Sequence, residues 1–357
     1  MQRLVLFTSA ACCFWLATSA TYAVDTLVKK KVGDREQVRI SGTVSLITTD
    51  EVRIKDNQNK EHVVPVNEVE SVRFEQEPRN MFVARGAALR GAYEEAIRMF
   101  GEFTDAELNL PAAKEDKNFY IAFATAQLAM TGGEVKVADA QKLLDAFVKA
   151  SPQSYHMLEA SQLLGDLYIM EQKYDDAAKA YDKLIGSSAV GYKMTGSILK
   201  GYALLAQNKV DDAQRLFQSV DSMGDSGNPQ DVQLRYAAKI GYAGCLGRTN
   251  PTEAIKVVDE VIEKTDEDPN LYAKAYNTLG ACYTRNKNSK EALLAYLKVD
   301  VLYFQSPQEH AEALKNLYQL WNSLTNLPNA RDRATESLEK LRARYPSSPQ
   351  ARSLSGS

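Results

Sequence analysis

Apolar residues follow two different periods along this chain, and the change falls near residue 77. In the first part they alternate with polar residues, which is typical of half-buried strands. The alternating pairs are Val38 and Ile40, Val44 and Leu46, Val52 and Ile54, and Val64 and Val66. Turn-forming residues separate the runs at 49–50 and 56–57. Residues 24–76 are therefore predicted to form four or five antiparallel strands, as a small barrel or a curled sheet, with Gly42 at a bend.

From about residue 78 the apolar period becomes helical. Seven alanines are each followed, four positions later, by a large apolar or aromatic residue, so the two lie one above the other on a helix. The pairs are Ala96 and Phe100, Ala140 and Leu144, Ala177 and Tyr181, Ala213 and Phe217, Ala254 and Val258, Ala292 and Tyr296, and Ala334 and Leu338. A repeated unit of two helices is predicted.

Three of these units also carry a glycine 12 residues before the alanine, at Gly165, Gly201 and Gly280. A small residue on each of two antiparallel helices lets the pair approach closely, while the aromatic residue fills the space beside it. One such pair cannot bury its own apolar face, so the units must stack. The predicted fold is mostly α, as a stack of helical hairpins.

This frame is similar to that of tetratricopeptide repeats, most closely over 158–187, 194–220 and 273–299. The resemblance covers roughly three quarters of the chain and implies an α-solenoid of about seven hairpins at 77–346, followed by a polar tail at 347–357. Successive alanine anchors lie 36 to 44 residues apart, against ~34 in the strict repeat. We expect longer turns or longer second helices to absorb the difference.

The alternating segment resembles the SH3-like or Sm-like β modules of some exported bacterial repeat proteins. The residues that carry this resemblance are Ser41-Gly42-Thr43-Val44, Asp50-x-Val52-x-Ile54 and Val64-Pro65-x-x-Glu68-Val69. Such modules bind RNA or peptides, or serve as a structural cap.

The first 23 residues have the pattern of a secretory signal peptide. Arg3 precedes an apolar run at 4–16, and the small-residue pattern of a cleavage site ends at Ala23, with a second candidate at Ala20. We expect cleavage and a periplasmic or secreted protein. An uncleaved signal that anchors the chain to the membrane, and a lipoprotein modified at Cys12, are the alternatives.

Composition restricts the function. The chain has 357 residues and a formal net charge of -3, whereas nucleic-acid binders usually carry a basic surplus. No phosphate-binding loop, HExxH motif or G-x-S-x-G elbow is present, and the three histidines have no metal-ligand spacing. Paired acids such as Asp175-Asp176 fall at the predicted start of second helices, where they favour the helix dipole. We therefore expect no catalytic, metal-binding or cofactor-binding residues.

After signal removal only Cys245 and Cys282 would remain. Both fall on first helices of successive units, so a disulfide bond is possible in an oxidising compartment. Their registers within the two helices differ, and we favour two unlinked buried thiols.

The resemblance also implies a binding surface, because in this family the first helices of the repeats line a concave groove that receives an extended peptide or a partner helix. Carried over position by position, the groove would include Gln162 and Asp166. The residues expected to bind the partner are Tyr202, Tyr242, Arg235, Lys274, Asn277 and Arg285. Aromatic and arginine side chains carry much of the energy at interfaces, and these cations would suit an acidic or carboxylate-ended peptide.

The sequence thus predicts a non-enzymatic protein-binding scaffold of the bacterial cell envelope, with a protein or peptide partner, no cofactor and no nucleic acid. An alternative assigns the ligand, which would be a glycan, peptidoglycan or nucleic acid, to the β module at 24–76, with the solenoid as a spacer.

Overall fold

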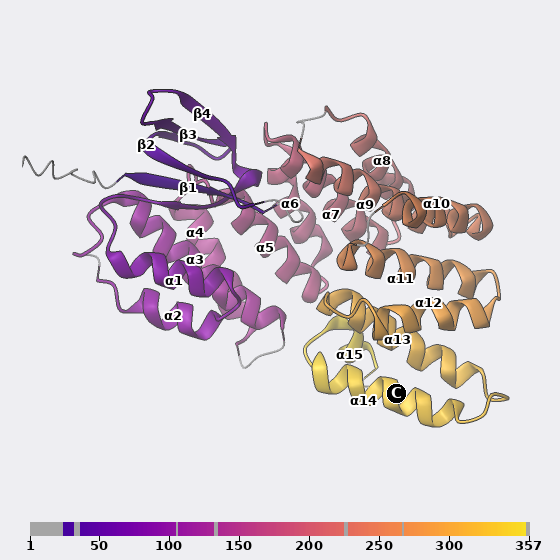
Figure 1. The fold of residues 1–357 in the computed structure, drawn as a ribbon. Coiled ribbons are helices and arrows are strands. Elements are labelled where there is room, and N and C mark those ends of the chain that lie inside the picture. Colours follow the sequence, from indigo (N-terminus) through magenta and orange to yellow (C-terminus); the bar gives the residue numbers. More distant parts are fainter. Residues whose placement is uncertain are drawn as a thin grey trace, which may run out of the picture.

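The computed structural model describes residues 24–31, 36–104, 106–131, 135–224, 228–265 and 268–354. The expected signal peptide at 1–23 lies outside the described residues. A small antiparallel sheet comes first and a curved array of helices follows it, as Figure 1 shows. The prediction of a mostly α fold with a preceding β module is confirmed.

The sheet has five strands in the order β4-β3-β2-β1-β5. Its strands are β1 (Asp25–Lys29), β2 (Arg39–Ile47), β3 (Glu51–Asp56), β4 (Glu61–Pro65) and β5 (Val69–Arg73). β4 and β5 do not pair, so the sheet is curled and open, and the barrel alternative is wrong. Gly42 pairs with β3, where an added Cβ would lie 1.9 Å from the carbonyl oxygen of Lys55, so the strands need a glycine there.

The helices form seven antiparallel hairpins and one short C-terminal helix within the described residues. The hairpins are α1 (Arg79–Leu89) with α2 (Tyr93–Gly101), α3 (Pro111–Met130) with α4 (Val137–Ala150), α5 (Met157–Met170) with α6 (Tyr174–Ile185), α7 (Val190–Ala206) with α8 (Val210–Asp221), α9 (Pro229–Leu246) with α10 (Pro251–Lys264), α11 (Pro269–Arg285) with α12 (Ser289–Val301), and α13 (Pro307–Ser323) with α14 (Ala330–Arg344).

The predicted small-residue frame holds these hairpins together. All seven anchor alanines are buried, each with at most 1% of its surface exposed. In three hairpins the aromatic ring of the second helix lies against the glycine of the first. The pairs, with the distance from an added Cβ to the nearest ring carbon, are Gly165–Tyr181 at 2.4 Å, Gly201–Phe217 at 2.8 Å and Gly280–Tyr296 at 2.6 Å. No larger residue fits there without displacing a buried ring.

Four of the turns inside hairpins share one backbone conformation. Each contains a residue with positive φ, namely Gly91 (82°), Gln172 (59°), Asn208 (62°) and Lys287 (62°). This left-handed region disfavours residues with a Cβ, so at Gln172, Asn208 and Lys287 the geometry is set by the packing of the two helices and not by a glycine in the sequence.

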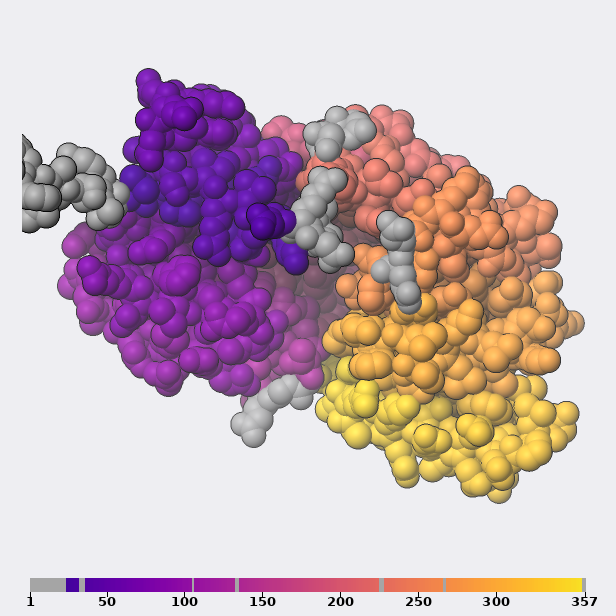
Figure 2. Space-filling view, viewed as in Figure 1, coloured from indigo at the N-terminus to yellow at the C-terminus, as the bar shows by residue number. Residues whose placement is uncertain are grey.

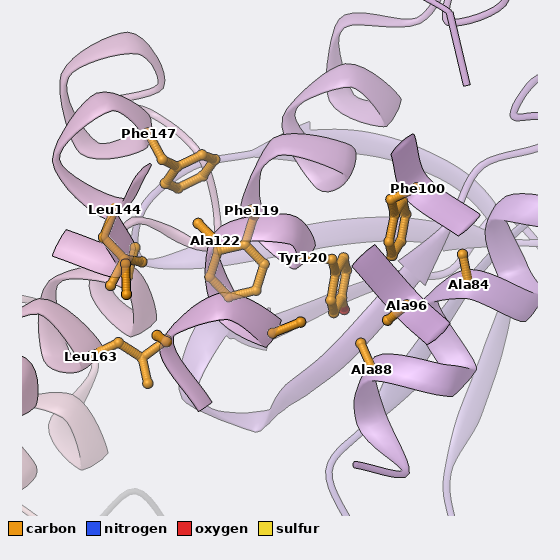
Figure 3. Close-up of a cluster of buried hydrophobic side chains, with 14 of the residues drawn as sticks. Ala84, Ala88, Ala96, Phe100, Phe119, Tyr120, Ala122, Leu144, Phe147 and Leu163 are labelled. Atoms are coloured by element: carbon orange, nitrogen blue, oxygen red, sulfur yellow. The ribbon is translucent and has the colours of Figure 1, made fainter. Parts of the chain in front are cut away.

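The first hairpins share a core rich in alanine and aromatic residues, drawn in Figure 3. The rings of Phe100 on α2 and Tyr120 on α3 stack with their centroids 5.5 Å apart and their planes at 1°. Alanines such as Ala84, Ala88 and Ala96 leave room for these rings between closely packed helices.

A buried ionic network joins the end of the sheet to the first three hairpins. Arg85 on α1 pairs with Glu77 and with Asp116 on α3, at 2.8 Å and 2.7 Å. Asp116 also accepts a hydrogen bond from the Tyr155 hydroxyl and contacts His156 Nε2 at 3.0 Å. Burial alone would raise the pKa of Asp116, but the Arg85 charge and these hydrogen bonds lower it.

The sheet and the solenoid share a hydrophobic core. Leu27, Ile54 and Val72 from the sheet belong to one cluster with Tyr155, which precedes α5, and Tyr192, which lies on α7. Asp50 in the β2–β3 turn accepts hydrogen bonds from the Ser187 hydroxyl at 2.6 Å and the Ser188 amide at 3.0 Å, in the α6–α7 connection. Residues 24–76 therefore bury their apolar face on the repeats.

The C-terminal end packs back onto the array. Within the segment expected to be a polar tail, Pro349–Ser353 form α15, because Ala351 and Leu354 supply an apolar face that is buried with α13 and α14. The guanidinium of Arg352 donates a hydrogen bond to the carbonyl oxygen of Met170 at the end of α5. The curved array of Figure 1 thus brings its last helix to its third hairpin.

Candidate functional site: a concave groove

A groove of about 900 Å³ runs along the inner side of the solenoid. Its walls are formed by the first helices α3, α5, α7, α9, α11 and α13 of six hairpins and by the residues that cap α11 and α13. Lys30 and Asn67 of the sheet region complete the wall. Second helices of the hairpins contribute none of the lining residues. A recess between the purple and the orange residues is visible in Figure 2.

Regular helical spacing places these side chains in the groove. On α5 they are Glu159, Gln162, Leu163 and Asp166, at positions i, i+3, i+4 and i+7. On α9 the residues at 230, 233, 234 and 237 repeat the same spacing. One face of a 3.6-residue helix produces this spacing, and the expected inward positions of Gln162 and Asp166 agree with it.

Side-chain amides are the most frequent polar groups of the groove. The seven amide residues are Asn67, Gln127, Gln162, Gln230, Gln233, Asn270 and Gln308. Each carries both a donor and an acceptor. The Oε1 atom of Gln233 is buried and accepts no hydrogen bond from any described residue. Apolar residues such as Phe123, Leu234 and Leu271 also line the groove.

Asp166 lies on the α5 wall of the groove, next to the interface with α6. The Tyr181 hydroxyl donates a hydrogen bond of 2.7 Å to its Oδ1 atom. Burial raises the pKa of Asp166 to about 6, against the opposing influence of the Tyr181 hydrogen bond and the Lys274 charge. The carboxyl group can therefore change its charge near neutral pH.

Lys274 on α11 is the centre of a second polar cluster. Its Nζ atom lies 4.2 Å from the centroid of the Tyr202 ring, a cation–π distance, and 3.5 Å from Oε1 of Glu309. Asn277 donates to the carbonyl oxygen and to Oε2 of Glu309, both at 2.9 Å. The Tyr202 hydroxyl and the Asn277 Oδ1 atom are buried without a hydrogen-bond partner in the described part of the chain.

The six residues expected to bind the partner do not gather at one place. Lys274 lines the groove, and Tyr202 and Asn277 belong to the cluster around it. Arg235 donates to four carbonyl oxygens at and beyond the end of α8, at 2.8 to 3.2 Å, and so caps that helix.

The other two expected residues lie elsewhere. Tyr242 lines a separate cavity of about 240 Å³, formed with Phe217, Tyr236 and residues of α10. Arg285 is exposed at the end of α11 and does not line the groove. The structure therefore does not assemble the positive strip of Arg235, Lys274 and Arg285.

The cysteines and the paired acids lie outside the groove lining. Cys245 and Cys282 are buried and unlinked, as favoured from their registers. The paired acids at 94–95, 175–176 and 211–212 occupy the first turns of α2, α6 and α8. Among the described residues no group of three or more metal-ligating side chains is suitably placed, and no described helix combines the length and the apolar character needed to cross a membrane.

Stacked two-helix units with a concave inner groove form a tetratricopeptide-like solenoid fold. Residues 123–191 match the family model for the tetratricopeptide repeat. The sequence matches no curated protein. A tetratricopeptide repeat protein from Parabacteroides merdae has the same fold, with a TM-score of 0.52, 12% identity, and 74% of this chain and 91% of that chain covered.

Two structures of the quorum sensor NprR are also similar. The apo form from B. thuringiensis has a TM-score of 0.40 and 15% identity, with 73% of this chain and 74% of that chain covered. NprR with its cognate peptide NprX has a TM-score of 0.43 and 16% identity, with 77% and 85% covered.

Proposed function

We propose that this chain is a non-enzymatic scaffold that binds an extended segment of a partner protein in its concave groove. The observation that carries the proposal is the lining of the groove, which combines seven side-chain amides with apolar residues. An extended peptide presents a backbone N–H and a C=O at every residue, and amides can pair with both. Gln233 Oε1, buried and without a described partner, would gain a donor from such a backbone.

The rigidity of the array supports binding without rearrangement. Most of the groove wall consists of helices packed by buried alanines and aromatic rings, so most of the lining side chains are positioned before the partner arrives. Preorganisation reduces the entropic cost of association. The complex of NprR with the peptide NprX shows a distantly similar solenoid bound to a peptide.

The β module is proposed to serve this same groove. Its apolar face is covered by the repeats, while Lys30 and Asn67 contribute to the groove wall. The alternative is that the β module binds a ligand and the solenoid only spaces it, and the described residues of the β module offer no comparable set of converging groups.

Location at the cell envelope is a further part of the proposal and is supported by the signal-like pattern of residues 1–23. Mass spectrometry of the protein purified from its native host would test it. A mature chain that begins after Ala20 or Ala23 is expected, and a full-length cytoplasmic chain would contradict it.

Site-specific photocrosslinking tests the groove. A photoreactive phenylalanine analogue at Gln233 should give partner adducts in cells, whereas the same analogue at Ala138, which is exposed on α4 outside the groove, should give few. Adding Ala237→Trp, which fills the groove from α9, should abolish the Gln233 adducts. Equal adducts at both positions, or no effect of the tryptophan, would refute binding in the groove.

A further inference from the structure

The chemistry of the partner can be inferred from the groove, and this inference rests on the function proposed above. We propose that the groove selects a segment with a basic side chain, lysine or arginine, and that the carboxylate of Asp166 binds this side chain. The inference reverses the expectation of an acidic peptide, and it follows from the charges that line the groove.

The lining contains more acids than bases. Its four carboxylates belong to Glu159, Asp166, Asp268 and Glu309, and its two amines to Lys30 and Lys274. The groove therefore has a net negative lining, and a partner with complementary charge is favoured in encounter and in register.

Two of the four acids already have partners. Glu309 contacts Lys274 and accepts from Asn277. Asp268 caps α11 by accepting from the amides of residues 270 and 271, both at 2.9 Å. Glu159 and Asp166 remain, and neither forms an ion pair with any described residue.

Asp166 is the better placed of these two acids. The Tyr181 hydroxyl fixes its Oδ1 atom, and no described donor bonds its Oδ2 atom. Glu159 lies seven residues earlier on the same face of α5, about 10.5 Å away along the axis, and adds negative potential without blocking Asp166. A half-buried carboxylate that meets an incoming cation makes a charge-assisted hydrogen bond of the stronger kind.

Asp166 should meet a side chain and not a chain terminus. The groove continues past α5 on both sides, to Phe123 and Gln127 on α3 and to α7–α13 in the other direction. A segment that fills the groove therefore passes Asp166 with its middle residues.

Binding of a cation should also be coupled to protonation. The described titratable groups that influence Asp166 are Tyr181 and Lys274, and its pKa is raised to about 6. A cation binds the ionised carboxylate, so a fall from pH 7.5 to pH 5 should weaken binding of a basic peptide by about tenfold. Replacement by asparagine should remove this dependence.

Affinity selection from synthetic peptide libraries tests the inference. The full-length purified protein is offered three random nonapeptide libraries, acetylated and amidated, with lysine, norleucine or glutamate fixed at the centre. We expect at least fivefold more retention of the lysine library than of the norleucine library at pH 7.5. The preference should disappear for Asp166→Asn and at pH 5, and should persist for Asp182→Asn, a matched change at an exposed site on α6.

The outcomes separate the two proposals. Retention of all three libraries alike, abolished by Ala237→Trp, would overturn the basic preference and leave the groove function intact. Retention that Ala237→Trp does not change would overturn both. A lysine preference that survives Asp166→Asn but not Glu159→Gln would overturn Asp166 as the anchor. If Asp166→Asn fails to fold, the pH profile of the wild-type protein decides, since a preference unchanged at pH 5 contradicts the inference.

Discussion

Replacing Gly280 by alanine tests the contact on which the solenoid depends. The new Cβ would lie 2.6 Å from Cε1 and Cζ of Tyr296 and 2.8 Å from Cε2, where ordinary contact begins at 3.4 Å. The ring must therefore move by about 0.8 Å, yet Tyr296 is only 3% exposed and is enclosed by α11, α12 and α13.

The magnitude follows from two opposing effects. Overpacking of a closed core costs about 1–3 kcal/mol. Removing a glycine from a helix returns roughly 0.5–1 kcal/mol. Gly280→Ala should thus destabilise the fold by about 1 kcal/mol, within limits of roughly 0–2.5 kcal/mol. At Gly101, also in a helix, an added Cβ meets nothing within 4 Å, so Gly101→Ala should be neutral or slightly stabilising.

Urea denaturation followed by far-ultraviolet circular dichroism measures both variants. A double-mutant cycle assigns the cause, because Tyr296→Leu removes the ring and should make Gly280→Ala harmless in that background, with a coupling of at least about 1 kcal/mol. If Gly280→Ala is as neutral as Gly101→Ala, or costs the same with and without the ring, the close approach does not hold the hairpin together.

Three other changes have predictable outcomes in the same unfolding assay. Arg85→Ala removes the cation that pairs with two buried carboxylates and should cost about 3–5 kcal/mol. Arg98→Ala breaks an exposed pair and should change stability by less than about 0.5 kcal/mol; equal effects of the two variants would contradict the stabilising role of the buried network. Lys287→Gly relieves the strain of a left-handed backbone conformation and should raise the free energy of unfolding by about 1 kcal/mol. Lys290→Gly, inside α12, should lower the free energy of unfolding. A lower stability of Lys287→Gly would refute the strain at this position. Because the folded-state pKa of Asp166, about 6, exceeds its ordinary value of 3.8, the folded state binds the proton more tightly and this group favours folding more as pH falls towards 4. The midpoint of the wild type relative to Asp166→Asn should therefore rise between pH 7.5 and pH 5, and an unchanged difference would show that the carboxyl is not perturbed.

The sequence predicts the solenoid well because its signal is local. Gly165 and Tyr181 lie 16 residues apart and meet directly, so their spacing alone implies the contact. The left-handed turns at Gln172, Asn208 and Lys287 have no such signal, since no glycine marks them. Their conformation follows from how two helices are already packed.

The groove lining is harder to predict, because the rotation of each helix about its own axis decides which side chains face the groove. Arg235 and Tyr242 lie on α9 but outside the face at 230, 233, 234 and 237. Arg235 faces the end of α8, where free carbonyl oxygens accept its hydrogen bonds. Asp166 is found by helical spacing alone, but its perturbed pKa depends on burial between hairpins.

The hydrogen bond between Arg352 and the Met170 carbonyl has a consequence for how this architecture can vary. Linear arrays lengthen or shorten by whole units, since each unit touches only its neighbours. Here a hydrogen bond joins the C-terminal helix to the third hairpin, and a chain with one hairpin fewer or more could not form it. This contact therefore favours the present number of hairpins between α5 and α15 by about the 0.5–1.5 kcal/mol that one hydrogen bond contributes.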